Sequence, residues 1–233
     1  MSSGPDHALL EAVAERAMAE LGDATRLGLG TGRAAEAFIQ RLARDPRKTG
    51  VVGVPTSERS AELARSLGLT LTSLADVPSL DIAFDGADEV DPSCALTKGL
   101  GGAMLRERVV AAEALRFVVL VTAEKIVDRL GARAPLPVEV APFALATATR
   151  RLERLSPRVE RRLTRGGENF VTDNQNAVLD LYAGDGGWAD PRALDRAVRS
   201  IAGVVDTGFF FGMASLVIIA DHGGVRVLTP PAL

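Results

Sequence analysis

Four ionisable residues, Asp85, Asp88, Lys98 and Glu107, lie within 23 consecutive positions of the chain. The two aspartates flank the dipeptide Gly-Ala, and such a turn can direct both carboxylates into one cleft. A positioned carboxylate can remove a proton from carbon, and an ammonium group can stabilise the oxyanion that forms. This set therefore predicts proton-transfer chemistry on an oxygen-rich, anionic substrate.

Two glycine-rich segments accompany these residues. Gly99, Gly101 and Gly102 follow Lys98 directly, and glycines allow the backbone N–H groups to approach a ligand closely. Segment 28–32 (Gly-Leu-Gly-Thr-Gly) follows an expected strand and opens a helix, which favours an anion such as phosphate. Its spacing, and the missing acidic residue after the next strand, argue against a nicotinamide cofactor.

Each of these residues also has an ordinary structural explanation. The two aspartates could be solvated acids of a turn, and Glu107 could pair with Arg106 or Arg108 at the surface. Segment 28–32 could be a tight turn only. Glu139 lies in an apolar strand and could be the partner of an arginine.

Lysine usage separates these possibilities in part. Only three of the 27 basic residues are lysines: Lys48, Lys98 and Lys125. In a chain so rich in arginine, a lysine is expected where a compact ammonium group is needed. Lys98 belongs to the ionisable set and Lys125 follows an apolar strand, where we expect it to begin a helix, whereas Lys48 lies in a polar loop.

The elements that position these residues are predicted from apolar periodicity. Helices are expected over residues 6–21, 34–43, 57–67 and 101–114, with Ser57 as the cap of the third, and strands over 26–30, 51–54, 69–71, 82–84 and 117–121. Strands that alternate with helices indicate an α/β fold with a doubly wound, mostly parallel sheet. Ligands of such sheets gather at the carboxyl ends of the strands, where Gly30 and Asp85 would lie.

A smaller α+β domain is expected to be inserted near the C-terminal part. It would contain an edge strand over 135–140, helices over 144–155 and 191–201, and strands over 160–163, 170–172 and 177–181. Strands over 215–220 and 225–228 would then complete the first sheet. The predicted division is 1–131 plus 207–233 for the α/β catalytic domain, and 132–206 for the small domain.

Composition excludes several classes of function. A net charge of −3 gives no electrostatic basis for binding nucleic acid or an anionic membrane. One cysteine cannot form an internal disulfide, and two distant histidines outline no metal site. Neither a secretory signal nor a membrane-length apolar run is present. We therefore expect a cytoplasmic protein without structural metal.

Five segments together resemble ribose-5-phosphate isomerase of the A type, a family of the pentose phosphate pathway and carbohydrate metabolism. They occur in the family's order and cover most of the chain. The segments are Gly28–Gly32, Ile82–Val90, Lys98–Glu107, Pro135–Val140 and Val171–Asp180.

The resemblance implies a role for each candidate residue in interconverting D-ribose 5-phosphate and D-ribulose 5-phosphate through an enediolate, without a cofactor. Glu107 would be the base, Lys98 with Asp88 would stabilise the oxyanion, and Asp85 would assist ring opening. Residues that would hold the sugar phosphate are Gly30, Thr31, Gly32, Arg33, Gly99, Gly101, Gly102 and Lys125. The resemblance also implies subunit contacts through the small domain, and residues 209–211 are a further candidate contact surface. We expect a homo-oligomer, with a dimer favoured over a tetramer.

Three departures from the family pattern affect the phosphate end. Arg33 and Ala34 stand where the family has Ser-Thr, Leu10 stands near the position of a phosphate-facing lysine, and Leu100 interrupts an all-glycine run. Arg33 could supply the lost contacts through a bidentate grip. The alternatives are an isomerase with another substrate, a non-catalytic sugar-phosphate sensor, or a related deaminase or CoA-transferase.

Overall fold

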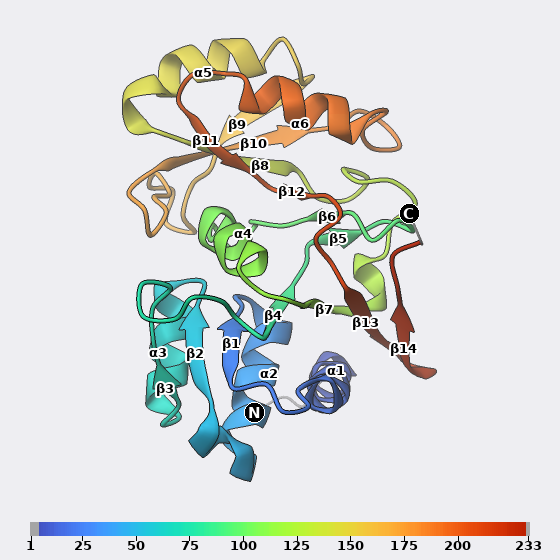
Figure 1. Ribbon diagram of the computed structural model, residues 1–233. Coiled ribbons are helices and arrows are strands. Elements are labelled where there is room, and N and C mark those ends of the chain that lie inside the picture. Colours follow the sequence, from blue (N-terminus) through green and yellow to red (C-terminus); the bar gives the residue numbers. More distant parts are fainter. Residues whose placement is uncertain (1–4, 232–233) are drawn as a thin grey trace. The chain divides into compact units, whose positions relative to one another are not determined.

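The computed structural model describes residues 5–231, which divide into two compact units (Figure 1). The first unit contains the described residues up to Ala87, Arg106–Lys125 and those from Gly212 onward. The second contains Asp88–Leu105 and Ile126–Phe211. Compact packing and independent folding are different properties, so the predicted division into two domains stays a prediction.

A seven-stranded sheet forms the centre of the first unit, in the order β14-β13-β7-β4-β1-β2-β3. All neighbouring strands are parallel except the β13–β14 pair. Its strands are β1 (Arg26–Leu29), β2 (Val52–Pro55), β3 (Thr70–Leu71), β4 (Ile82–Gly86), β7 (Phe117–Thr122), β13 (Leu216–Asp221) and β14 (Gly224–Leu228). The mostly parallel α/β fold predicted from the sequence is confirmed.

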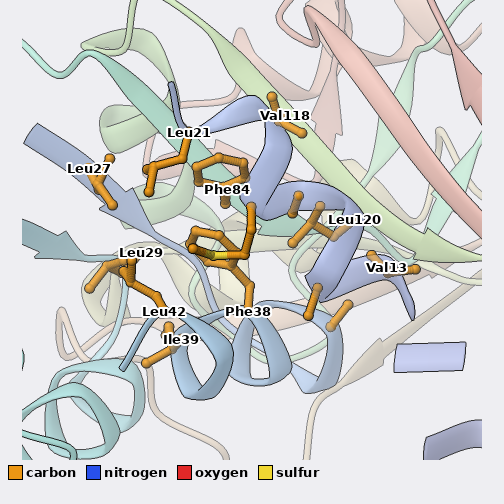
Figure 2. Close-up of a cluster of buried hydrophobic side chains, with 14 of the residues drawn as sticks. Val13, Leu21, Leu27, Leu29, Phe38, Ile39, Leu42, Phe84, Val118 and Leu120 are labelled. Atoms are coloured by element: carbon orange, nitrogen blue, oxygen red, sulfur yellow. The ribbon is translucent and has the colours of Figure 1, made fainter. Parts of the chain in front are cut away.

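Helices cover both faces of this sheet. Leu27 and Leu29 of β1 pack with residues of α1 and α2 in one core, in which Phe38 stacks on Phe84 with ring centroids 4.1 Å apart (Figure 2). Gly28 points to the opposite face, where a Cβ at this position would lie 2.6 Å from Val110 of α4. The helices are α1 (Pro5–Glu20), α2 (Arg33–Ala43), α3 (Glu58–Ser66) and α4 (Met104–Ala112), with short 3₁₀ segments η1 (Pro46–Gly50) and η2 (Ala123–Lys125).

Two antiparallel sheets form the second unit, with strand orders β11-β8-β10-β9 and β12-β6-β5. Apolar residues of β8, β10, α5 and α6 make its core. Its elements are β5 (Glu89–Val90), β6 (Leu96–Thr97), β8 (Leu136–Val140), η3 (Pro142–Ala144), α5 (Leu145–Leu152), β9 (Arg158–Arg161), β10 (Ala177–Tyr182), α6 (Pro191–Arg199), β11 (Val204–Thr207) and β12 (Phe209–Phe210).

The turn between β5 and β6 contains the single cysteine. Cys94 is 2% exposed and has a left-handed backbone with φ of 61°. Burial and the nearby Asp91 carboxylate both raise the pKa of its thiol. Asp91 also closes the turn, because its side chain accepts from the N–H groups of Ser93 and Ala95 at 2.8 and 3.0 Å.

Several local predictions were wrong. The strand expected at the sheet edge, β8, lies between β11 and β10, and all five of its residues are buried. Proline removes one N–H, but the carbonyl of Pro137 still accepts from the N–H of Gly208 at 2.8 Å. Residues 170–172 form no extended strand and make one isolated bridge, Val171 to Ala177.

Three further differences concern residues that were singled out from the sequence. The helix expected from residue 101 begins at Met104, because Gly102 has a positive φ of 84° that interrupts the helical backbone. Lys125 ends the 3₁₀ segment η2 and does not begin a helix. Phe209 and Phe210 are 0% exposed, so they belong to the interior and not to an open contact surface.

Among residues 5–231, no helix combines the length and the apolar character that crossing a bilayer requires.

Candidate functional site

The first candidate segment, called here the Thr31 loop (residues 28–32), connects β1 to α2. Its backbone lies so close to Asp85 that a Cβ at Gly30 would be 2.3 Å from the Asp85 carboxylate. The N–H groups of Thr31 and Gly86 both donate to Asp85 Oδ1, at 2.9 and 2.7 Å. The loop therefore fixes a buried carboxylate, 2% exposed, at the carboxyl end of β4.

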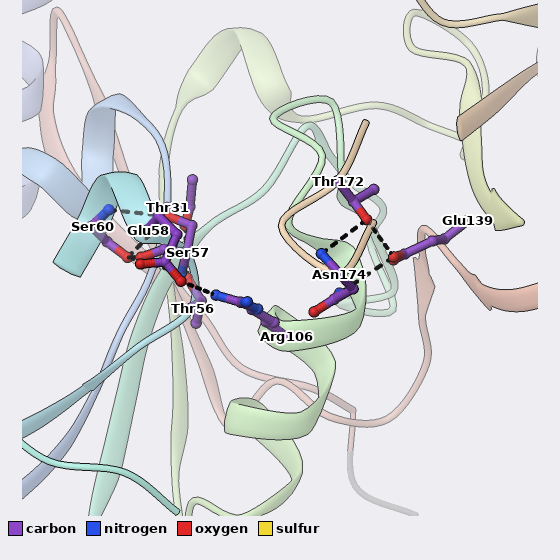
Figure 3. Close-up of polar contacts among 9 residues, drawn as sticks. All are labelled: Thr31, Thr56, Ser57, Glu58, Ser60, Arg106, Glu139, Thr172 and Asn174. Atoms are coloured by element: carbon purple, nitrogen blue, oxygen red, sulfur yellow. Dashed lines mark hydrogen bonds and ion pairs between the residues drawn. The ribbon is translucent and has the colours of Figure 1, made fainter. Parts of the chain in front are cut away.

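A cluster of hydroxyl groups surrounds the Thr31 side chain (Figure 3). Its Oγ1 lies 2.7 Å from Thr56 Oγ1 and 2.7 Å from Ser57 Oγ. Ser57 caps α3 in a reciprocal capping box with Ser60, so α3 itself holds the cluster in place. Sequence reasoning recognised Ser57 only as a cap and missed Thr56, because their approach to Thr31 depends on the pairing of β1 with β2.

Glu107 lies in the first turn of α4 and is 5% exposed. The neighbouring Arg106 donates to Glu58 at 2.8 Å, and this hydrogen bond lowers the pKa of Glu58 (Figure 3). Arg108, the other partner considered for Glu107, places its Nη1 3.6 Å from Met213 Sδ. Burial of a carboxylate is costly in water-poor surroundings, and such positions are frequent in functional sites.

The second candidate segment, called here the Lys98 loop (residues 98–102), belongs to the second unit. Lys98 is 2% exposed, and its Nζ lies 5.7 Å from the ring centroid of Phe210. Its backbone N–H donates to Gly208 at 2.8 Å. Farther along the loop, the N–H of Leu100 donates to Asp88 Oδ2 at 2.9 Å. Asp88 and the loop that follows Lys98 are thus brought together.

The remaining predicted phosphate residues occupy different places. Gly32 precedes α2 with φ of 101°, and because glycine has no side chain to cap a helix, the N–H groups of the first turn can bind an anion. Arg33 is exposed and is the first residue of α2. Lys125 is half-buried at the end of η2, and Gly101 is exposed while Gly99 and Gly102 are buried.

Glu139 is fully buried in β8 and takes part in a separate polar network. Thr172 Oγ1 and the side-chain amide of Asn174 donate to its Oε1 at 2.8 and 3.3 Å (Figure 3). The side-chain amide of Asn176 donates to the same oxygen at 2.9 Å. These contacts join the turn after residue 171 to the sheet, in place of the arginine partner considered from the sequence. No set of three or more possible metal-ligating side chains occurs among residues 5–231.

The structure therefore brings the candidate residues together in two groups. Gly30, Thr31 and Asp85 lie in contact within the first unit, and Asp88, Leu100 and the Lys98 loop do so within the second. The chain passes from the second unit to the first inside α4, between Leu105 and Arg106, just before Glu107.

The family model described as ribose 5-phosphate isomerase A (phosphoriboisomerase A) matches residues 52–224 of the chain. Among curated proteins, ribose-5-phosphate isomerase A of Roseiflexus castenholzii is 49% identical over 229 residues, which cover 97% of each chain. The protein of the same name from Gloeobacter violaceus is 46% identical over 226 residues, covering 96% of this chain and 97% of its own.

Solved structures agree with these sequence matches. A D-ribose-5-phosphate isomerase in complex with phospho-erythronic acid has a TM-score of 0.90 at 32% identity, covering 96% of this chain and 98% of the other. Ribose 5-phosphate isomerase A of Methanocaldococcus jannaschii has a TM-score of 0.89 at 34% identity, covering 96% and 99%.

Proposed function

Because this chain belongs to the ribose 5-phosphate isomerase A family, we propose that it interconverts D-ribose 5-phosphate and D-ribulose 5-phosphate. The observation that carries the proposal is the burial of three ionisable side chains. Asp85, Lys98 and Glu107 are each exposed by 5% or less, and all three lie in the segments that match the family. Withholding charged groups from water is costly, and enzymes use such groups for proton transfer.

Glu107 is the base of the proposed reaction. It removes the proton from C2 of the open-chain aldose, and the electron pair moves into the C1–C2 bond, which leaves an enediolate. Lys98 stabilises the negative oxygen, and Asp88 orients the groups around it. Glu107 then returns the proton to C1, while a proton moves from O2 to O1, and the ketose forms without gain or loss of electrons.

Asp85 assists opening of the furanose ring in this scheme. Its Oδ1 is fixed by the N–H groups of Thr31 and Gly86, which determines the direction of the carboxylate. The ring oxygen must gain a proton and the C1 hydroxyl must lose one when the ring opens. A carboxylate held in one orientation is suited to accept the hydroxyl proton.

The phosphate group is held by the Thr31 loop, the start of α2 and Lys125 in this proposal. Gly30, Thr31 and Gly32 offer backbone N–H groups and one hydroxyl, while Gly99, Gly101 and Gly102 serve the sugar oxygens. The hydroxyls of Thr56 and Ser57 lie next to Thr31, so the site contains hydroxyl groups despite the Arg33-Ala34 substitution.

Arg33 supplies the cation missing from the N-terminal helix in this proposal. Leu10 of α1 and Arg33 of α2 line the same groove between these helices. This shared groove supports the proposal that Arg33 takes the place of the lysine expected near Leu10, since a guanidinium can bind phosphate through two N–H groups.

Conversion of ribose 5-phosphate by the purified chain, with EDTA present and with free ribose assayed in parallel, tests the proposal. We expect rapid formation of ribulose 5-phosphate and little turnover of free ribose. Binding of ribose 5-phosphate without turnover would instead favour the alternative, a non-catalytic sugar-phosphate sensor. Turnover of another phosphorylated sugar alone would indicate an altered substrate.

We also propose that the chain acts in the cytoplasm as a homodimer, with a tetramer as the second possibility. Apolar side chains of the second unit support self-association, because Phe143, Leu163 and Val171 are all exposed. Light scattering coupled to size-exclusion chromatography measures the mass, and a monomer at micromolar concentration would contradict this part of the proposal.

A further inference from the structure

An arginine that was not identified from the sequence contacts the Lys98 loop through a largely buried side chain. Arg162 follows β9, and its side chain is 10% exposed. Its Nε donates to Asp180 Oδ2 at 2.9 Å, and its Nη2 pairs with Asp180 Oδ1. The remaining Nη1 donates to the carbonyl oxygens of Gly99 and Leu100, at 2.7 and 3.0 Å. One guanidinium therefore joins a carboxylate of β10 to two consecutive peptide groups of the loop.

These contacts determine where the opposite ends of the two peptide groups point. In a trans peptide the C=O and N–H groups point in opposite directions, and the structure has no cis peptide among the described residues. With the Gly99 carbonyl on Arg162, the N–H of Leu100 points away and donates to Asp88 Oδ2 at 2.9 Å. With the Leu100 carbonyl on Arg162, the N–H of Gly101 also points away from the guanidinium.

The side chains and peptide groups described above form a row in which positive and negative groups alternate, so each contact in the row is electrostatically favourable. The Asp180 carboxylate faces the Arg162 guanidinium, which faces the negative ends of two peptide dipoles, and one positive end faces the Asp88 carboxylate. Hydrogen bonds in such a row polarise one another, particularly where water is excluded. Asp180, 11% exposed at its side chain, is as buried as Arg162, so the Asp180–Arg162 end of the row is shielded, whereas Leu100 at the other end is 41% exposed.

Aromatic packing supports the same arrangement. The ring of Phe170 lies 5.8 Å from the Arg162 guanidinium carbon. The same ring leaves no room for a side chain at Gly102, where a Cβ would lie 2.3 Å from Phe170 Cζ. The Lys98 loop therefore packs against the side chains of Arg162 and Phe170.

We propose that Arg162, held by Asp180, is a positioning residue for the isomerisation, resting on the function proposed above. It fixes two peptide groups so that the N–H of Leu100 orients the Asp88 carboxylate and the N–H of Gly101 donates to the negative oxygen of the enediolate. Arg162 itself does not touch substrate. Consecutive N–H groups that point the same way are a known arrangement for binding anionic oxygens.

The test compares Arg162→Lys with Arg161→Lys, a matched control at the preceding, exposed arginine. Lysine keeps the positive charge but has a single nitrogen, so it cannot bind both Asp180 oxygens while a separate nitrogen binds the two carbonyls, as the guanidinium does. We expect Arg162→Lys to lower kcat about 10- to 100-fold, the range for a displaced catalytic group. KM for ribose 5-phosphate should change much less, because the phosphate is bound by other residues. Arg161→Lys should behave as wild type.

Two inhibitors separate positioning from general damage. Phospho-erythronic acid carries a planar carboxylate that imitates the two oxygens of the enediolate, whereas inorganic phosphate occupies the phosphate site alone. We expect Arg162→Lys to weaken inhibition by phospho-erythronic acid about tenfold or more, as for loss of hydrogen bonds to a charged group. Inhibition by inorganic phosphate should stay as in wild type.

Asp180→Asn provides a second variant if Arg162→Lys fails to fold. It keeps the side-chain shape but removes the charge that holds the guanidinium, so kcat and phospho-erythronic acid binding should fall in the same direction. Unchanged kcat in a folded variant of either kind would overturn the inference. An equal loss of affinity for both inhibitors would overturn it as well. An inactive wild-type protein would instead overturn the proposed function.

Discussion

Two glycine-rich loops, similar in composition, are held by opposite means. The Thr31 loop is fixed by short contacts from its own sheet: the Asp85 carboxylate and the hydroxyls of Thr56 and Ser57. The Lys98 loop is fixed by a long side chain from a distant segment, Arg162, which is in turn held by a buried carboxylate.

The difference teaches that glycine content alone does not describe a ligand-binding loop. Glycine allows close approach, but the direction of the N–H groups is set by whatever occupies the other face of the loop. For the Thr31 loop, that support comes from neighbouring parallel strands and is spread over several weak contacts. For the Lys98 loop it is concentrated in one guanidinium, so a single substitution should disturb it more.

The largest expected effect falls on neither loop but on the base Glu107, which follows the Lys98 loop in sequence. Glu107→Gln removes the group that accepts the C2 proton, so turnover should fall by roughly 10²–10⁴. Stopped assays of ribose 5-phosphate conversion measure this, with Glu113→Gln, an exposed glutamate just after the end of α4, as control. Near-normal turnover would remove Glu107 from the mechanism.

The second-largest effect is expected when a glycine of each loop is replaced by alanine. Gly102→Ala and Gly32→Ala both place alanine at a positive φ, 84° and 101°, which costs about 1–2 kcal/mol of unfolding free energy. Only the first would also clash, with Phe170 Cζ at 2.3 Å, whereas no atom lies within 4 Å at Gly32. We expect Gly102→Ala to lose about 1–3 kcal/mol more in urea unfolding. Equal losses would show that Phe170 moves aside readily.

A smaller effect is expected from the hydroxyl cluster. Thr56→Val keeps the shape of the side chain but removes one hydrogen bond to Thr31, which is worth about 0.5–1.5 kcal/mol. KM for ribose 5-phosphate should rise by roughly 2- to 10-fold with kcat nearly unchanged. Thr56→Ser, which restores the hydroxyl, should recover the wild-type KM. A fall in kcat alone would mean that the cluster serves the reacting carbons.

The smallest effect is expected at Asp81, which accepts a hydrogen bond from the N–H of Arg26 at the start of β1, the strand that leads into the Thr31 loop. The side-chain hydrogen bond from Arg26 holds the pKa of Asp81 at about 2, helped by the N–H groups of Thr25 and Arg26. A lowered pKa stabilises the fold above the unfolded value of about 3.9 and the benefit disappears as pH falls towards 2. Asp81→Asn should therefore cost about 1 kcal/mol near neutral pH, and nothing at about pH 2.

Urea unfolding of both proteins across this pH range measures the Asp81 contribution. A difference between wild type and Asp81→Asn that persists unchanged to about pH 2 would assign it to shape and not to charge. The half-exposed Arg26–Asp81 pair can then be set against the buried Arg162–Asp180 pair, for which the larger loss is expected.

Much of the fold was predictable from local pattern. The uninterrupted apolar run of β7 indicated a buried parallel strand, and all six of its residues are buried. Ser57 was recognised as a cap from its position before an apolar-periodic segment, and it makes a full capping box. The start of α4 was misplaced, because sequence periodicity does not register the positive φ of Gly102.

Site residues could be predicted from the sequence only where they lie close to one another along the chain. Asp88, Lys98 and Glu107 were identified by residue type and spacing. Arg162 was not, because it lies more than 60 residues from the loop that it contacts, among many other arginines. Glu139 shows the same limit, since its carboxylate meets amide groups of the turn after Thr172 and not an arginine. Such partners are chosen by sheet pairing, which the sequence pattern does not encode.

The buried thiol of Cys94 allows the opening of the hairpin of β5 and β6 to be measured by chemical labelling. This hairpin begins next to Asp88 and ends next to Lys98, and its cysteine is shielded and has a raised pKa. A thiol reagent can therefore react only in molecules whose hairpin has transiently separated from the core. Since the chain has one cysteine, the labelling rate measures that separation without any introduced probe. Ligands that order the hairpin should slow the labelling in proportion to their occupancy.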